Sequence, residues 1–375
     1  MIKITKLDVM VYRFPLATPV QTSFGLMQDR PMVLVKLTSD EGITGWGEIW
    51  CNFPNVGAEH RAHLVTSVFA PLVLSKDHAT AEAAFDFLTE STWVLGLQTG
   101  EFGPLAQCIA GIEIALSDIY AKQKDMPLWK LYGGQTSEVP VYASGINPTN
   151  PADIASKAID LGYRGLKLKI GFGERTDCEN LATLSHLAGD KVDLMVDANQ
   201  AWNLNQALTM LEALAKFDLK WLEEPIAADR PQDEWRHLQK AASMPLAAGE
   251  NIQGDKEFNI VINQDVLAVI QPDLAKWGGL SKTVPIARNI ISAGKRYCPH
   301  YLGGGVGLAA SAHLLAAVGG GGMLEIDSND NALRGDLFSP TITNGQITLS
   351  DETGLGVANR FAVLLASGVG RGVVG

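Results

Sequence analysis

Ionisable side chains recur at a regular spacing through the second half of this 375-residue sequence. Each one lies at the end of a short apolar run, and from the second onward they are 23 to 28 residues apart. The set consists of Lys167, Lys169, Asp197, Glu223, Glu250, Asp273, His300 and Glu325. Carboxylates bind divalent cations, and lysine, histidine and carboxylate groups move protons. The spacing therefore predicts a single pocket for metal-assisted acid–base chemistry.

Eight apolar, strand-like runs separated by amphipathic helical segments explain this spacing. The runs cover residues 139–144, 165–170, 193–199, 219–225, 245–250, 266–273, 295–300 and 322–327. Parallel strands need a crossover helix, and the carboxyl ends of barrel strands form the mouth where active sites are built. We therefore expect an α/β barrel over residues 126–330. A doubly wound open sheet is the alternative, but no glycine-rich dinucleotide turn follows the first strand.

The remaining segments predict a second, smaller unit. Residues 2–50 alternate apolar and polar positions as in an antiparallel sheet, and residues 58–122 have helical spacing. We therefore expect an α+β capping domain over residues 1–125. Residues 331–375 are expected to form loops and a few strands that pack back onto this cap.

Composition excludes several classes of partner. Thirty Lys and Arg against 41 Asp and Glu give a formal charge of −11, which disfavours nucleic acid and anionic membranes as partners. The four cysteines form no CxxC pair, and the first residues lack the apolar core of a signal peptide. The uncharged stretch 297–324 is broken by proline and glycines. We expect a cytoplasmic enzyme acting on a small molecule.

Lys167 and Lys169 alternate with leucines, so their ammonium groups should share the inner face of one strand. Like charges buried together should depress the pKa of at least one of them toward the range of a useful base. Nearby carboxylates would compensate the charge. For any single residue of the set, a salt-bridged charge at the barrel rim is the alternative interpretation.

Asp197, Glu223 and Glu250 end three successive strands, so their carboxylates could converge on one point. Three oxygen ligands without Cys or His favour a hard cation, and Mg²⁺ is the natural choice, with Mn²⁺ as a substitute. We prefer Glu223 to Glu224 from the order of the motif. Asp273 and His300 end adjacent strands and could form a carboxylate–imidazole pair.

At this point the sequence resembles the enolase superfamily, in particular its mandelate racemase/muconate lactonizing enzyme family and the mandelate racemase branch. The resemblance covers nearly the whole chain. It is carried by GWGE (45–48), KLKIGFG (167–173), VDANQAW (196–202), WLEEP (221–225), AAGEN (247–251), QPDLAKWGG (271–279), PHYLGGGVG (299–307) and LEID (324–327). Other branches of the family carry a lysine where this chain has Asp273, and Lys276 is expected to be a supporting charge beside the site.

The resemblance implies a modified (β/α)7β TIM barrel beneath the cap and a site that removes a proton α to a carboxylate. Mg²⁺, held by the three acidic residues, and Lys167 would bind the substrate carboxylate. Lys169 would act as acid or base on one face, and His300, assisted by Asp273, on the other. Glu325 would hydrogen-bond the substrate or the enediolate. The resemblance also implies a homo-oligomer, from dimer to octamer.

Specificity is expected in two cap loops, residues 19–30 and 50–57. The candidate substrate-binding residues are Gln21, Ser23, Trp50, Asn52, Asn199 and Tyr301. Polar loop residues favour a polyhydroxylated acid, so dehydration of an aldonic or aldaric acid to a 2-keto-3-deoxy acid is the leading expectation. Racemisation or epimerisation of an α-substituted acid and cycloisomerisation of a lactone use the same intermediate and stay open. A non-catalytic metabolite-binding relative is the remaining alternative.

Overall fold

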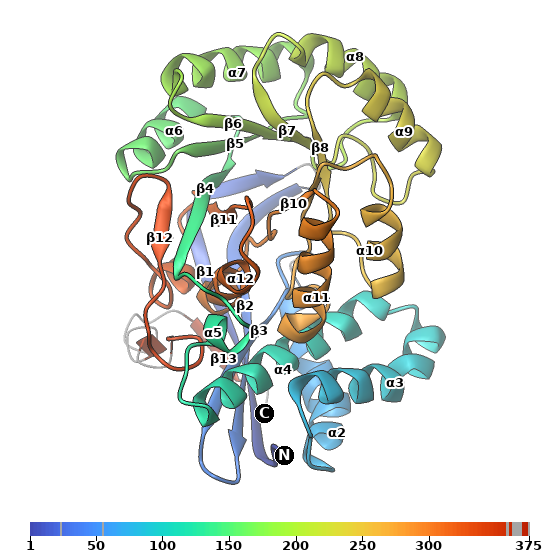
Figure 1. The fold of residues 1–375 in the computed structure, drawn as a ribbon, viewed down its shortest axis with the longest axis vertical. Helices are drawn as coiled ribbons and strands as arrows, with labels where there is room; N and C mark the ends of the chain where they lie inside the picture. Colours follow the sequence, from blue (N-terminus) through green and yellow to red (C-terminus); the bar gives the residue numbers. More distant parts are fainter. Residues whose placement is uncertain (23–24, 55, 358–359, 362–369, 374–375) are drawn as a thin grey trace.

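The computed structural model describes residues 1–375 except 23–24, 55, 358–359, 362–369 and 374–375. A barrel of parallel strands surrounded by helices lies above a cap of antiparallel strands and helices, as Figure 1 shows. The predicted α/β fold with an α+β cap is therefore confirmed.

The cap is built on a four-stranded antiparallel sheet of order β13-β1-β2-β3. Its strands are β1 (Ile4–Thr22), β2 (Gly25–Ser39), β3 (Thr44–Ile49) and β13 (Gly370–Val373). The helical segments are α1 (Gly57–Leu64), the π-helix η1 (Val65–Phe69), α2 (Ala70–Leu74), α3 (Ala81–Thr99) and α4 (Phe102–Gln123). β13 brings the end of the chain back to β1.

The prediction of a loop over residues 19–30 is wrong in one respect, because most of these residues belong to the paired strands β1 and β2. Val20 pairs with Met27 and Thr22 with Gly25, so β1 and β2 continue as a hairpin toward the barrel mouth. Antiparallel pairing satisfies the backbone groups that a free loop would leave to water. The second segment, from Trp50 to the start of α1, is irregular as expected.

The barrel consists of seven strand–helix units followed by an eighth strand, which is the (β/α)7β arrangement. The strands are β4 (Glu138–Ile146), β5 (Gly165–Lys169), β6 (Asp193–Asp197), β7 (Leu219–Glu223), β8 (Leu246–Ala248), β9 (Val269–Ile270), β10 (Arg296–Tyr297) and β11 (Leu324–Asp327). The helices are α6 (Pro151–Asp160), α7 (Glu174–Ala188), α8 (Leu204–Leu214), α9 (Gln232–Ala241), α10 (Asp255–Ile262), α11 (Gly279–Ser292) and α12 (Gly305–Val318). Short helices α5 (Leu128–Leu131) and α13 (Ala332–Gly335) flank the barrel, and β12 (Gln346–Thr348) pairs with β4.

The parallel sheet follows the order β10-β9-β8-β7-β6-β5-β4-β11. Its two end strands approach each other where the Met323 N–H donates to Cys298 Sγ at 3.4 Å. The interior below the mouth is filled by buried side chains from five strands and from the residue that follows β10: Tyr142, Met195, Trp221, Ala247, Val269 and Cys298. The described barrel interior is therefore a packed core, with a layer of charged residues at the strand ends.

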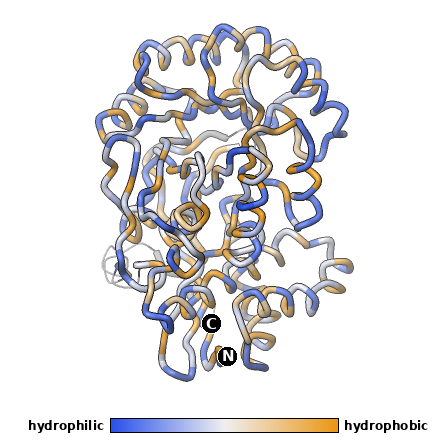
Figure 2. Tube along the Cα trace, viewed as in Figure 1, coloured by the Kyte–Doolittle hydropathy of each residue, from blue (hydrophilic) through white to orange (hydrophobic). Residues whose placement is uncertain are grey.

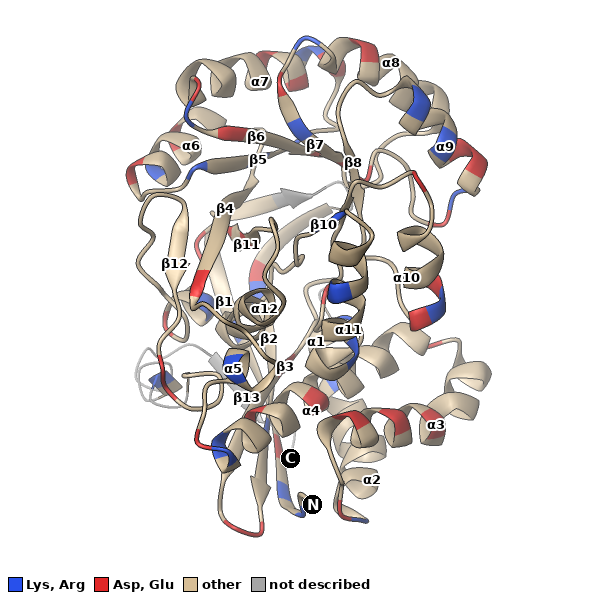
Figure 3. Cartoon of the chain, viewed as in Figure 1, with Lys and Arg blue, Asp and Glu red and all other residues tan. Residues whose placement is uncertain are grey.

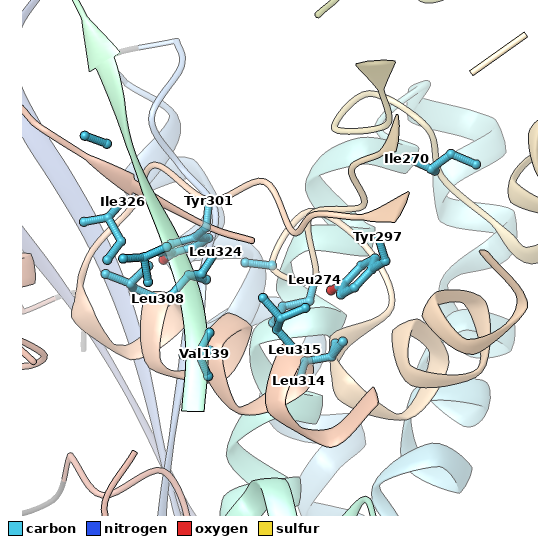
Figure 4. Packing of buried hydrophobic residues seen from close by; sticks show 14 of the residues in the cluster. Val139, Ile270, Leu274, Tyr297, Tyr301, Leu308, Leu314, Leu315, Leu324 and Ile326 are labelled. Carbon is cyan, nitrogen blue, oxygen red and sulfur yellow. The ribbon is translucent and has the colours of Figure 1, made fainter. Parts of the chain in front are cut away.

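The outer face of the sheet packs against the helices. Leu314 and Leu315 of α12 face Leu274 and Tyr297 across the interior shown in Figure 4. Figure 2 shows the alternation of apolar and polar positions along α7, α8 and α9, which lie on the outside. One face of each such helix is buried and the other is in water, as amphipathic periodicity requires.

Helix α12 explains the uncharged stretch of the sequence. Its residues from Gly305 to Ala317 are all buried, and Figure 3 shows it free of charged residues, in contrast to α7 and α9. Helix α4 is the one helix of the described chain that is long and apolar enough to cross a membrane. However, 78% of its apolar window is buried inside the molecule, which is the environment of a core helix.

Candidate active site

Four strand ends meet in a cluster of buried ion pairs. Lys167 Nζ lies 2.6 Å from Glu223 Oε2 and 2.7 Å from Glu325 Oε1. Lys169 Nζ lies 2.5 Å from Asp197 Oδ2. The ends of β5, β6, β7 and β11 therefore converge, as the regular spacing predicts.

The expectation that one lysine would have a depressed pKa is wrong for this arrangement. Burial lowers the pKa of Lys167, but the Glu223 and Glu325 carboxylates raise it further, to well above its usual value. Burial likewise lowers the pKa of Lys169, and Asp197 outweighs it. Each ammonium has a carboxylate in contact, whereas the sequence argument gave most weight to the repulsion between the two lysines.

The imidazole of His300 lies between two carboxylates. Its Nδ1 is 2.8 Å from Asp273 Oδ2, and its Nε2 is 2.5 Å from Glu250 Oε2. Asp273 is itself fixed, because its Oδ1 accepts the backbone N–H groups of Ala275 and Lys276 at 2.9 and 3.2 Å. Burial lowers the pKa of His300, but Glu250, Glu325 and Asp273 raise it to well above its usual value. An imidazole held at Nδ1 in this way has its Nε2 oriented for proton transfer.

Glu223 and Glu224 both belong to the cluster. Glu223 Oε2 accepts from Gln271 Nε2 at 2.6 Å and from Trp221 Nε1 at 3.3 Å as well as from Lys167. Burial and Asp197 raise the pKa of Glu223 to about 7. Burial and Glu250 raise the pKa of Glu224 to about 8. Glu224 Oε2 is buried without a hydrogen-bond partner in the described structure.

The number and arrangement of the carboxylates at the mouth show whether a divalent cation fits this site. Across the described residues, no three His, Cys, Asp or Glu side chains are placed to hold a metal ion as they stand. Instead, Asp197, Glu223 and Glu250 each contact a cationic side chain. The buried groups at the mouth are the carboxylates Asp197, Glu223, Glu224, Glu250, Asp273 and Glu325, the lysines Lys167, Lys169 and Lys276, and His300. Negative charge exceeds positive charge in this set, and an oxygen-only donor set of this kind fits a hard divalent cation.

A cavity at the mouth joins the barrel to the cap. Lys169, Glu250 and His300 line it from the barrel. Three of the predicted substrate-binding residues also line it, namely Trp50, Asn52 and Asn199. Asn199 Oδ1 additionally accepts from Lys169 Nζ at 2.9 Å.

Tyr301 and Lys167 do not line this cavity in the described structure. Tyr301 follows the end of β10 and is buried, and burial together with the charge of Glu48 raises its pKa to well above its usual value. Its contact with substrate stays a prediction. Lys167 is fully buried beneath the cavity between its two carboxylates. Ser23 and the side chain of Gln21 lie outside the described residues.

Two carboxylates of the cap that hold barrel helices are not among the residues predicted from the sequence. Glu48 accepts the backbone N–H groups of Gly304 and Gly307 at 2.5 and 2.9 Å, at the start of α12. Glu113 accepts those of Leu280 and Ser281 at 2.6 and 3.0 Å, at the start of α11. The GWGE motif marked Glu48, but only the packing of cap on barrel shows what it binds.

Comparison with known proteins shows the family of this chain. Residues 4–133 match the model of the mandelate racemase/muconate lactonizing enzyme N-terminal domain, and residues 151–362 match that of the enolase C-terminal domain-like family. The chain belongs to the mandelate racemase/muconate lactonizing enzyme family of the enolase superfamily, whose members are lyases and isomerases.

Solved structures show the same fold. A mandelate racemase/muconate lactonizing enzyme from Bordetella bronchiseptica RB50 is 48% identical with a TM-score of 0.92, covering 98% of this chain and 99% of the other. A racemase from Streptomyces coelicolor A3(2) with bound magnesium is 28% identical with a TM-score of 0.85 over 98% and 99%. A protein described as an enolase from Bradyrhizobium, with magnesium and mandelic acid bound, is 25% identical with a TM-score of 0.83 over 97% and 98%. Magnesium and small carboxylic acids are thus bound by relatives of this chain.

Curated relatives cover three reactions. The L-talarate/galactarate dehydratase of Salmonella typhimurium is 30% identical over 91% of this chain and 85% of its own length. The D-galactarolactone cycloisomerase of Agrobacterium fabrum is 28% identical over 96% and 98%. The N-succinyl-L-Arg/Lys racemase of Bacillus cereus is 28% identical over 78% of both chains.

Proposed function

We propose that this protein dehydrates a sugar acid, aldonic or aldaric, to a 2-keto-3-deoxy acid by removing the proton α to the carboxylate. The observation that carries the proposal is the pairing of two proton-transfer groups on one cavity. Lys169 and His300 both line it, and each contacts a carboxylate that orients it. A substrate between them meets a base at one face and an acid at the other.

The donor set would hold Mg²⁺, with Mn²⁺ as a substitute, through Asp197, Glu223 and Glu250. The ion would stabilise the negative charge that develops on the substrate carboxylate as the proton leaves and would compete with Lys169 for Asp197. Lys167 and Glu325, held together at 2.7 Å, would support the carboxylate end of the substrate from below. Trp50, Asn52 and Asn199 would contact the remainder of the substrate.

Proton transfer then follows from the two side chains. Neutral Lys169 would take the α-proton at Nζ, leaving an enediolate. Protonated His300 would give its Nε2 proton to the β-hydroxyl, which leaves as water. The resulting enol becomes the 2-keto-3-deoxy acid on taking a proton at C3. Asp273 holds Nδ1 throughout, which keeps Nε2 facing the substrate.

The same pair of groups supports a second candidate, racemisation or epimerisation. If His300 returns a proton to the α-carbon on the face opposite Lys169, the configuration inverts and no water is lost. Cycloisomerisation of a lactone would use the same enediolate. A non-catalytic role is disfavoured, because a binding protein has no need for both proton-transfer groups on the cavity.

We further propose that the enzyme is cytoplasmic, forms a homo-oligomer between dimer and octamer, and has no nucleic-acid or membrane partner. The acidic balance of the chain supports the last point. Size-exclusion chromatography with light scattering would measure the oligomeric state, and a monomer would contradict it.

The test of the proposed function uses wild-type protein with Mg²⁺ in D₂O. It is incubated with aldonic and aldaric acids, their lactones and simple α-hydroxy acids, and both keto product and α-deuterium are measured. A keto acid from one stereochemical series is the expected result. Deuterium at the α-carbon without keto product would contradict dehydration and favour racemisation or cycloisomerisation. No reaction with any sugar acid would contradict the proposed substrate class.

A further inference from the structure

The cap side of the active-site cavity carries a buried arginine with spare hydrogen-bonding capacity. Arg30, on β2, lines the cavity and is only 3% exposed. Its Nη2 lies 2.6 Å from Asp327 Oδ2 at the end of β11. Its Nε is buried and has no hydrogen-bond partner in the described part of the chain. Leaving a buried N–H of a charged group unsatisfied is costly, so its position at a cavity wall indicates a ligand acceptor.

A second donor belongs to a residue that lines the same cavity. The indole Nε1 of Trp50 is also buried without a partner among the described residues, and Trp50 lines the same cavity. The ammonium of Lys276 lies 4.6 Å from the centre of its ring. Lys276 lines the cavity too, with its Nζ 3.4 Å from Glu250 Oε1 and 3.2 Å from Asn251 Oδ1. The lining of the cavity therefore offers N–H donors from two cap residues, with a cation beside Trp50.

The charge around Arg30 does not balance. Asp327 is shared by two guanidinium groups, because Arg334 Nη1 lies 3.5 Å from the same Oδ2 that Arg30 contacts. The other oxygen, Oδ1, accepts the N–H and Nδ2 of Asn329 at 3.0 and 2.7 Å. One carboxylate thus faces two cations, and a further anion would complete the pairing.

We propose that Arg30 and Trp50 bind a second carboxylate of the substrate, so that this enzyme acts on diacids. Lys276, held by Glu250, adds positive charge beside Trp50. The inference rests on the proposed function, in which the first carboxylate lies at the metal end of the cavity. A carboxylate supplies several acceptor lone pairs and the missing negative charge, whereas a terminal hydroxyl supplies no charge. A charge-assisted bond in a buried site also discriminates strongly against an analogue that lacks the group.

Two kinds of diacid share this chemistry: aldaric acids and N-succinylated amino acids. Asparagine side chains line the cavity at Asn52, Asn147, Asn199 and Asn329, and amide groups both donate to and accept from hydroxyls. The aldaric acid is therefore the expected source. N-succinyl amino acids form a separate arm of the test.

The experiment measures kcat/KM of the Mg²⁺-loaded enzyme for aldaric acids, for aldonic acids of matched length and stereochemistry, and for N-succinyl amino acids. Wild-type enzyme should prefer the aldaric member of a matched pair by roughly 100-fold or more. Arg30→Met should lose most of that preference, measured as the ratio of kcat/KM for the two acids, and Arg30→Lys should retain part of it. Trp50→Phe, which keeps an aromatic ring and removes the N–H, should reduce the preference without loss of the fold.

Two controls separate binding from folding. Arg30→Met combined with Asp327→Asn removes both members of the Arg30–Asp327 pair and should show the same loss of preference. Thermal melting of both variants checks that they are folded. Arg61→Met removes another buried cap arginine, which hydrogen-bonds Gln107 at 2.8 Å, and should leave the ratio unchanged.

The outcomes separate the two proposals. Equal or better use of aldonic acids by wild-type enzyme, or an unchanged preference in Arg30→Met, would overturn the diacid inference and leave the dehydratase standing. Arg30-dependent exchange of N-succinyl amino acids would support the diacid site and overturn dehydration. Neither product nor α-deuterium from any of the acids would overturn both.

Discussion

Buried side chains at the strand ends are charged in pairs, and their protonation states follow from their contacts. Asp197, 2.5 Å from Lys169 Nζ, raises the pKa of Lys169 and favours its protonated form, although burial works against the charge. A cation bound by Asp197 would weaken this effect and favour the neutral amine that the proposed reaction needs. A buried charge without such a partner would be far more costly. The positions of these residues were predictable from their spacing. Their pKa directions were not, because these depend on which carboxylate each cation touches.

His313 on α12 provides a pH prediction away from the site. Burial lowers its pKa to about 4, and its Nδ1 accepts the Trp129 N–H at 3.1 Å. An unfolded histidine binds its proton near pH 6.5. The buried neutral imidazole of His313 therefore makes its full contribution to the free energy of unfolding above pH 6.5. This contribution, up to about 3 kcal/mol, is lost as the pH falls toward 4.

Urea unfolding of wild type and His313→Gln between pH 7.5 and 4.5 checks this sign. We expect the free energy of unfolding of wild type to fall more steeply on acidification than that of the variant, whose amide oxygen still accepts the N–H. His186→Gln, at an exposed position of α7, is the matched control and should follow wild type. Parallel curves for wild type and His313→Gln would contradict the prediction.

Helices α11 and α12 begin directly after the segments that carry Asp273 and His300, and both starts are held by cap carboxylates. Glu113 and Glu48 satisfy backbone N–H groups that a helix start leaves unpaired, and their charge is favourable at the positive end of the helix dipole. The cap therefore positions one half of the site. Sequence periodicity predicts each helix but cannot show which distant side chain caps it.

We expect Glu113→Gln to destabilise the fold by about 1–3 kcal/mol, since the amide keeps one acceptor oxygen, turns its NH2 toward the other backbone N–H and loses the charge. Because α11 follows Asp273, the change should reduce α-proton exchange at the His300 face more than at the Lys169 face. Exchange rates of the two α-epimers of a substrate would measure this difference. The control is Glu82→Gln, which removes an ion pair between Glu82 on α3 and Lys282 on α11. It should change neither the stability nor the ratio of the two exchange rates. Equal losses of exchange at both faces in Glu113→Gln would contradict a positioning role.

Strand number and order were predictable, whereas the ends of elements were less so. The run 266–273 forms a ladder only over Val269–Ile270, because the residues beyond it turn toward the mouth. The segment 19–30 has polar residues and a glycine that suggest a loop, yet it pairs as a hairpin. Pairing is a tertiary contact that local composition does not contain.

At the scale of the whole molecule, the cap closes the barrel mouth through buried charge. Arg30 reaches from β2 to Asp327 at the end of β11, a separation of 297 residues. The two-domain division was visible as a change of periodicity in the sequence. The contacts between the domains were not, because nothing local links residues so far apart in the chain.

The acidic excess at the mouth predicts that Mg²⁺ stabilises the whole fold. An ion that binds only the native state at 100 times its Kd adds about 2.7 kcal/mol to the free energy of unfolding. Thermal melting with Mg²⁺ and with EDTA should show this gain in wild type. Glu250→Gln should remain folded, because the residue lies at a strand end, and should show little gain.

Glu212→Gln at an exposed position of α8 is the control for the loss of one carboxylate. It should respond to Mg²⁺ as wild type does. An unchanged Mg²⁺ response in Glu250→Gln would move the third ligand elsewhere.

The central claim is that Lys169 and His300 act on opposite faces of one substrate. It is tested most directly by following α-proton exchange in D₂O for wild type, Lys169→Ala and His300→Asn, using both α-epimers of the best sugar acid. We predict that each variant loses keto product by at least about 1,000-fold while exchanging the α-proton of only one epimer, a different one in each case. Full turnover in either variant, or exchange of the same epimer by both, would contradict the account.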